Sequence, residues 1–132
     1  MRIYITHCSA KKNDSFRNTA EKVPPDRLYL ATPTQRFMKE CKERGVRWAI
    51  FSDKYGVWFP EEKHEWYEKD PDTVSEQEFK NLVRNFEEKL ANYDQLWFYY
   101  NPGRFHPLYE RLLKEVKVKG KITLFTHKNQ IT

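Results

Sequence analysis

Residues 48–60 read Trp-Ala-Ile-Phe-Ser-Asp-Lys-Tyr-Gly-Val-Trp-Phe-Pro, and this stretch decides the fold that we expect. The apolar run at 46–51, broken by one arginine, is typical of a central strand covered on both faces, where apolar and polar residues need not alternate. Residues 52–55 then leave its carboxyl end. Gly56 tolerates a positive φ angle, and Pro60 interrupts a regular strand. The stretch therefore predicts a buried strand that delivers a loop suited to a binding site.

Three further apolar segments have the composition of buried strands, at residues 2–6, 95–100 and 121–126. Amphipathic helical patterns separate the strands, at residues 33–44, from Ser75 onward and from about Pro107 onward. Alternating strands and helices are typical of a parallel sheet with helices packed on it. We therefore predict a single α/β domain over residues 1–132, with a mainly parallel sheet of four or slightly more strands and helices on both faces.

The two longer helices carry local start signals. Ser75 and Glu78 have the spacing of a capping box, and an apolar stripe that includes Phe79, Val83 and Phe86 follows, which predicts a principal core helix. For the helix at 33–44, we expect Thr32 as the N-cap, Gln35 as its capping-box partner and Gly45 as the stop. Cys41 lies on the apolar side of that helix and is expected in the core.

Composition narrows the class of protein. Aromatic residues make up 16% of the chain, which argues against disorder. The net charge of +5 permits nucleic acid or a phosphorylated ligand as partner without requiring either. Two cysteines without a CxxC motif make no disulfide framework, and neither a signal peptide nor a membrane-spanning stretch is visible. We expect a cytoplasmic protein without a membrane partner, and the excess of Lys and Glu favours a heat-adapted source.

All four predicted strands end in polar segments, at residues 7–12, 52–55, 101–104 and 127–130. The carboxyl ends of parallel strands meet at one edge of a sheet, where such folds bind their ligands. We therefore expect one shared concavity there. Its expected lining is Cys8, Ser9, Ser52, Lys54, Tyr55 and Asn101, with Glu65 or Tyr67 closing its side.

Two of these loops also resemble a known family. They read Cys8-Ser9-x-Lys11-Lys12 and Ser52-x-Lys54-Tyr55-Gly56-Val57, with Pro60 nearby. This pairing resembles an uncharacterised bacterial and archaeal domain family related to the peroxide-stress protein YaaA. A similar Cys-Ser-x-Lys loop occurs in the core domain of archaeosine synthase, which modifies a deazaguanine base in tRNA. The similarity covers about residues 3–67.

The resemblance implies nucleic acid or a nucleobase as ligand, because YaaA-like proteins are associated with DNA and archaeosine synthase with tRNA. It supplies no reaction. Tyr67 looks like a family tyrosine that normally follows a proline, but Trp66 precedes it here. Asp53 stands where the family usually has a small residue.

The candidate catalytic residues are Cys8, Ser9 and Lys11. Cys8 becomes a nucleophile if neighbouring basic groups lower its pKa, and it is otherwise a small buried side chain at a strand end. The candidate ligand-binding residues are Ser52, Lys54, Tyr55, Gly56, Glu65, Tyr67, Asn101 and Arg104. Lys54 suits a phosphate or carboxylate, Tyr55 suits stacking on a base, and Asn101 suits a base edge, although each is also an ordinary loop residue.

The motifs leave the cofactor unknown. The four histidines are too scattered to propose a metal site, and no glycine-rich phosphate loop is present. An enzyme, or a relic of one, that acts on a nucleobase or nucleotide-like group, in tRNA or DNA, predicts a deep pocket. The alternative, a non-catalytic nucleic-acid-binding module, predicts a shallow basic groove. A plain protein-interaction domain is the third interpretation. The sequence does not decide between catalysis and binding, nor does it give the oligomeric state.

Overall fold

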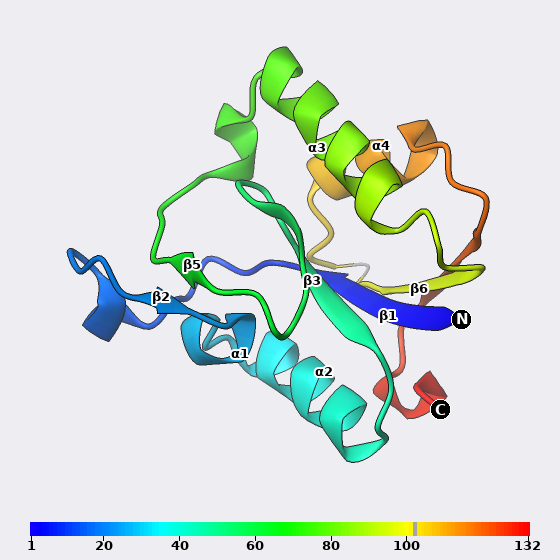
Figure 1. The fold of residues 1–132 in the computed structure, drawn as a ribbon, viewed down its shortest axis with the longest axis horizontal. Helices are drawn as coiled ribbons and strands as arrows, with labels where there is room; N and C mark the ends of the chain where they lie inside the picture. The colour runs from blue at the N-terminus through cyan, green and yellow to red at the C-terminus, as the bar shows by residue number, and fades with distance from the viewer. Residues whose placement is uncertain (102) are drawn as a thin grey trace.

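A five-stranded sheet forms the centre of the protein (Figure 1). The computed structural model describes residues 1–101 and 103–132. In spatial order the strands are β4 (Gly56–Trp58), β3 (Trp48–Ser52), β1 (Arg2–His7), β6 (Gln95–Tyr99) and β7 (Lys121–Phe125). β1 pairs in parallel with β3 and β6, and β6 pairs in parallel with β7. The predicted parallel sheet is confirmed. The antiparallel β4, which forms a hairpin with β3, is a strand that the sequence pattern did not indicate.

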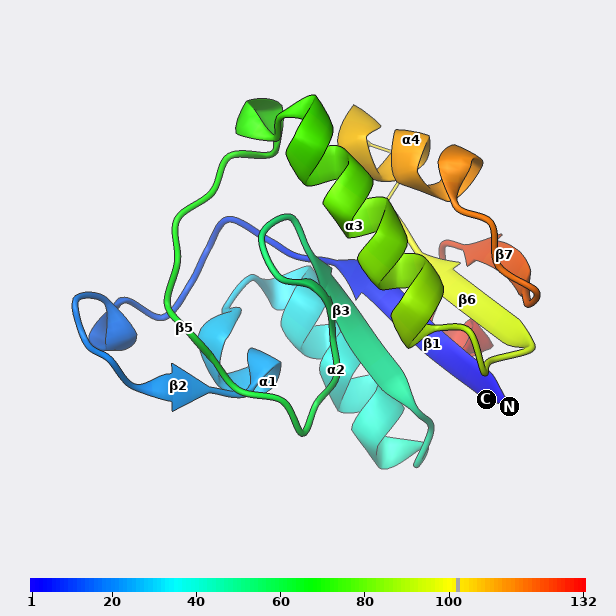
Figure 2. The same cartoon turned by 45° about the horizontal axis from the view of Figure 1, so that its top comes forward.

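Helices cover both faces of the sheet, as predicted. Figure 2 shows α2 (Thr32–Glu43) on one face, and α3 (Glu76–Lys89) and α4 (Pro107–Glu115) on the other. The remaining elements are short: β2 (Lys22–Val23), α1 (Pro25–Leu28), β5 (His64–Glu65) and the 3-10 turns Asp14–Phe16, Pro71–Thr73 and Lys128–Gln130. No helix in the described residues has the length and apolar character needed to cross a membrane.

The start of α3 has the predicted capping box. The Ser75 hydroxyl accepts from the Glu78 N–H at 3.1 Å, and the Glu78 carboxylate accepts from the Ser75 N–H at 3.0 Å. Two of the three expected core residues, Phe79 and Phe86, are buried, while Val83 is partly buried against the core. The role of α3 as a core element is confirmed.

The start of α2 differs from the prediction. Its N-cap is Ala31, one residue before the expected Thr32, and no side chain caps the helix. Gln35 does not reach back to the cap, because its amide donates to the backbone carbonyls of Asp26 and Tyr29. Among the described residues, no side chain therefore accepts the N–H groups of Thr32 and Thr34 in the first turn of α2, where Pro33 has none to donate. Cys41, by contrast, is fully buried as predicted.

The connections that follow the adjacent parallel strands β1 and β6 run in opposite directions along the sheet. The chain leaves β1 and returns through α2 to β3 on one side, whereas it leaves β6 and returns through α4 to β7 on the other. Connections that diverge from two adjacent parallel strands open a crevice beyond their carboxyl ends, and open α/β sheets bind ligands there.

Candidate functional site

Three neighbouring hollows lie along the carboxyl edge of the sheet. The first lies where the connections after β1 and β6 diverge, and we name it the switch-point crevice. It has a volume of about 120 Å³ and is bordered by His7, Ser9, Thr34, Asn101 and Arg104. The Asp53 cavity, of about 80 Å³, is bordered by Cys8, Ser9, Lys12, Asp53, Lys69 and Tyr109. The Lys54 groove, of about 340 Å³, is bordered by Asp53, Lys54, Tyr55, Glu78 and Asn85. Ser9 borders the first two and Asp53 borders the last two, so adjoining hollows replace the one concavity that we expected.

The predicted site residues divide accordingly. Six of them border a hollow: Cys8, Ser9, Lys54, Tyr55, Asn101 and Arg104. Ser52, Gly56 and Tyr67 are buried and border none of the three. Lys11 and Glu65 are exposed and also border none of them.

Ser52 holds the loop after β3 in place. Its hydroxyl accepts the N–H groups of Lys54 at 3.1 Å and Tyr55 at 3.0 Å, and donates to the Tyr67 hydroxyl at 3.0 Å. The Tyr67 hydroxyl lies 2.6 Å from that of Tyr29. Burial raises the pKa of Tyr67 far above its usual range. Ser52 and Tyr67 thus hold the loop in position.

Gly56 is required by its surroundings. Its φ angle is +76°, and a Cβ atom built there would lie 2.2 Å from the Asn85 side-chain oxygen. That oxygen accepts the Val57 N–H at 2.8 Å. The glycine therefore allows α3 to approach and fix the β3–β4 turn.

Tyr55 already has a stacking partner. Its ring lies parallel to that of His64, with 4.0 Å between the ring centroids, and its hydroxyl donates to the Glu65 carbonyl at 3.1 Å. One face of the ring is therefore unavailable to a base. The Lys54 ammonium lies 5.3 Å from the Tyr55 ring centroid, and both residues border the Lys54 groove.

The expectation that basic neighbours lower the pKa of Cys8 is wrong. Cys8 is only 8% exposed, and burial together with the charge of Asp53 raises the pKa of its thiol to about 11. The thiol contacts the Tyr109 hydroxyl at 3.2 Å. Lys11 is exposed, and the Lys12 ammonium lies over the Tyr67 ring, 4.5 Å from its centroid. Cys8 is therefore a protonated thiol near neutral pH, not an activated nucleophile.

Asp53 borders two of the three hollows but was not among the candidate residues named from the sequence. Its side chain is buried, with 3% of the residue exposed, and burial raises the pKa of its carboxyl group. The Cys8 thiol, the charge of Lys12 and the Tyr67 hydroxyl oppose that rise. Buried carboxylates are rare unless they are paired or have a chemical role. The signal in the sequence was a carboxylate two residues after Phe51, where the apolar run of the central strand ends.

The switch-point crevice has the features of an anion site. The Ser9 hydroxyl is buried and has no hydrogen-bond partner among the described residues. The uncapped first turn of α2 and Arg104 border the same crevice. Arg104 forms no ion pair with any residue that the structure describes. Helix N-termini and arginine side chains both favour negatively charged groups.

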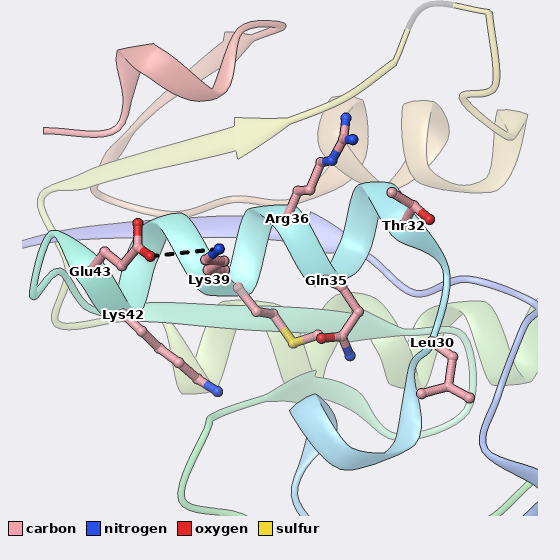
Figure 3. Close-up of a pocket in the computed structure, with 8 residues that line it drawn as sticks. Leu30, Thr32, Gln35, Arg36, Lys39, Lys42 and Glu43 are labelled. Carbon is pink, nitrogen blue, oxygen red and sulfur yellow. Dashed lines mark ion pairs between the residues drawn. The ribbon is translucent and has the colours of Figure 1, made fainter.

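A larger and shallower hollow, of about 600 Å³, lies on the outer face of α2 (Figure 3). Its basic residues are Arg36, Lys39 and Lys42, of which Arg36 and Lys42 leave the helix on opposite sides. Lys39 forms a loose ion pair with Glu43 at 3.9 Å. We name this surface the α2 basic hollow.

No family model, curated protein or solved structure matches this chain. The resemblance to YaaA-related domains therefore stays a prediction. Among the described residues, no group of three His, Cys, Asp or Glu side chains is arranged to hold a metal ion.

Proposed function

We propose that the protein binds a small nucleotide-like ligand non-covalently at the carboxyl edge of its sheet, with the anionic group of the ligand in the switch-point crevice. The observation that carries the proposal is the buried Ser9 hydroxyl without a partner, beside the uncapped N-terminus of α2 and Arg104. A buried hydroxyl without a partner costs about 1 to 3 kcal/mol, which a bound phosphate oxygen would offset.

Charge and location agree with this ligand class. The N–H groups at the start of α2 and the guanidinium of Arg104 favour an anion. The position between β1 and β6 is the crevice where open α/β sheets bind ligands. The crevice, of about 120 Å³, is close in size to an engineered cavity of about 150 Å³ that holds benzene, so it suits one compact group rather than a polymer.

Binding accounts for the site better than covalent catalysis. A thiol with a pKa of about 11 has very little thiolate near neutral pH. Burial also lowers the pKa of His7, whose ring stacks on Tyr109 with 4.8 Å between centroids, so His7 is neutral there. Neither group supplies the activated nucleophile that an enzyme acting through Cys8 needs.

Calorimetry with adenosine 5′-monophosphate and adenosine tests the proposal. We expect the monophosphate to bind more tightly than adenosine. Arg104→Gln should weaken the binding of the monophosphate about tenfold. Arg84→Gln on the exposed side of α3 is the matched control and should change nothing. Equal binding of the two compounds, or equal effects of the two substitutions, would refute the proposed anion site.

A second candidate function has its own observation. The α2 basic hollow is open and shallow, and Arg36 forms no ion pair among the described residues. Such a surface suits the phosphate backbone of RNA or DNA, as the binding-module interpretation requires. It makes no use of the crevice, so the two functions are separable by mutation.

A further inference from the structure

We infer that the Asp53 cavity recognises the lactam edge of a heterocyclic base, that is, a ring N–H beside a ring C=O. This inference rests on the proposed function, since it places the base of the same ligand next to the crevice that receives its anionic group. Ser9 borders both hollows and marks where they adjoin.

The first observation is an acceptor without an adequate donor. Asp53 borders the cavity and is only 3% exposed. Its only hydrogen bond within ordinary distance among the described side chains comes from the Cys8 thiol, at 3.6 Å, and the Tyr67 hydroxyl lies near enough to lower the pKa of the carboxyl group. A thiol is a weak donor. The carboxylate can therefore accept an N–H from a ligand, and a buried carboxylate gains more from such a donor than an exposed one does.

The second observation is a donor in the same cavity. Lys12 borders the cavity, forms no ion pair among the described residues, and rests over the Tyr67 ring. Lys69, the other lysine there, is already engaged, because its ammonium lies 2.9 Å from the Glu78 carboxylate. Lys12 is thus the ammonium available to a ligand carbonyl.

An acceptor and a donor that border the same small cavity favour a ligand edge with the complementary pair. A lactam edge places its N–H at Asp53 and its C=O at Lys12. The corresponding edge of adenine has the opposite order, with a ring nitrogen acceptor facing the carboxylate and an amino donor facing the ammonium. Both contacts would then be repulsive, so the cavity discriminates between the two edges.

The size of the cavity excludes a whole nucleoside, and its charge disfavours a cationic ligand. About 80 Å³ holds the edge of a ring or two to three waters, at about 30 Å³ each, but not a whole nucleoside. A cationic ligand would meet Lys12 and Lys69 beside the carboxylate. A neutral edge with one donor and one acceptor avoids that repulsion.

Inosine 5′-monophosphate and adenosine 5′-monophosphate form the matched pair of probes, because they share the phosphate and the sugar and differ in this edge. We expect calorimetry to show that the inosine compound binds about ten- to a hundredfold more tightly. Asp53→Asn should bring that ratio close to one, since a carboxamide presents either an oxygen or an NH₂ group. Arg104→Gln should weaken both compounds equally and preserve the ratio.

The outcomes separate this inference from the proposed function. Equal binding of the two nucleotides, with both weakened by Arg104→Gln, would overturn the lactam inference and leave the anion site standing. An unchanged ratio in an Asp53→Asn protein that melts at or above the wild-type temperature would also overturn it. Failure of both nucleotides to bind would mean that the cavity holds only water and that the proposed function is wrong as well.

Discussion

The Cys8 thiol donates to the Asp53 carboxylate across 3.6 Å. The charge of Asp53 raises the pKa of Cys8, while the thiol hydrogen bond lowers the pKa of Asp53. Both effects favour the same state, with the proton on sulfur and the charge on the carboxylate. The pair therefore presents an acceptor, and not a nucleophile, to the Asp53 cavity.

The first prediction concerns thiol reactivity. With a pKa of about 11, Cys8 has on the order of a hundredfold less thiolate than an ordinary thiol near neutral pH, so iodoacetamide should label it slowly in the folded protein. Cys41 is fully buried, with a pKa of about 12, and should react later still. Peptide mass spectrometry over a time course measures both rates.

Asp53→Asn should speed the labelling of Cys8, because it removes the charge that raises the pKa of the thiol. Asp94→Asn, at the opposite edge of the sheet, is the control and should leave the labelling rate of Cys8 unchanged. If Cys41 reacts before Cys8, the placement of the two thiols is wrong.

The second prediction links Asp53 to stability. Its folded-state pKa is raised by burial, so the folded protein binds a proton at this carboxyl group more tightly than the unfolded chain does. This contribution is fully present below the unfolded pKa of about 3.9 and is lost as the pH rises through the folded pKa. Asp53→Asn should therefore raise the melting temperature near neutral pH, and the gain should shrink on acidification. Melting curves over a pH series measure this, and a lower melting temperature at neutral pH would contradict it.

Local sequence patterns account for the sheet and for α3, because apolar runs, a capping box and a regular stripe are encoded within a few residues of each other. They do not account for the Asp53 cavity. Its wall joins Cys8 to Tyr109, whose hydroxyl contacts the thiol across a sequence separation of 101 residues. Tyr109 has the pattern of a sheet-covering residue, and only the assembled fold shows where its hydroxyl points. The β3–β4 hairpin was also missed, since a short strand next to Pro60 has too few residues for a periodic signal.

The third prediction compares two glycines. Both have positive φ angles, +63° for Gly45 and +76° for Gly56. Gly45→Ala should cost about 1 to 2 kcal/mol, because the backbone conformation is its only obstacle. Gly56→Ala should cost more, because the new Cβ would collide with Asn85 and disturb its hydrogen bond to Val57. Urea unfolding measures both, and equal losses would show that Asn85 moves aside without cost.

The fourth prediction concerns the core face of α3. Phe86 is fully buried and packs edge-on against Phe51, with 5.9 Å between ring centroids. Phe86→Ala should reduce the free energy of unfolding by about 3 to 5 kcal/mol through cavity formation. Val83→Ala, at a partly buried position, is the control and should cost less. A loss below about 1 kcal/mol for Phe86→Ala would show that this face of α3 does not belong to the core.

The last prediction tests the α2 basic hollow as a nucleic-acid surface. Phosphate contacts release counterions, so any affinity for RNA or DNA should fall steeply as salt is raised from low to moderate concentration. Arg36→Gln should weaken binding and reduce the slope of log affinity against log salt by about one, as expected for the loss of one phosphate contact. Arg84→Gln alters an exposed helical arginine on the other face of the sheet and should leave the slope unchanged. Fluorescence anisotropy with a labelled oligonucleotide gives both quantities. Absence of binding at low ionic strength would exclude the nucleic-acid function and leave small nucleotides as the ligands, whereas equal effects of the two substitutions would assign the binding to diffuse charge.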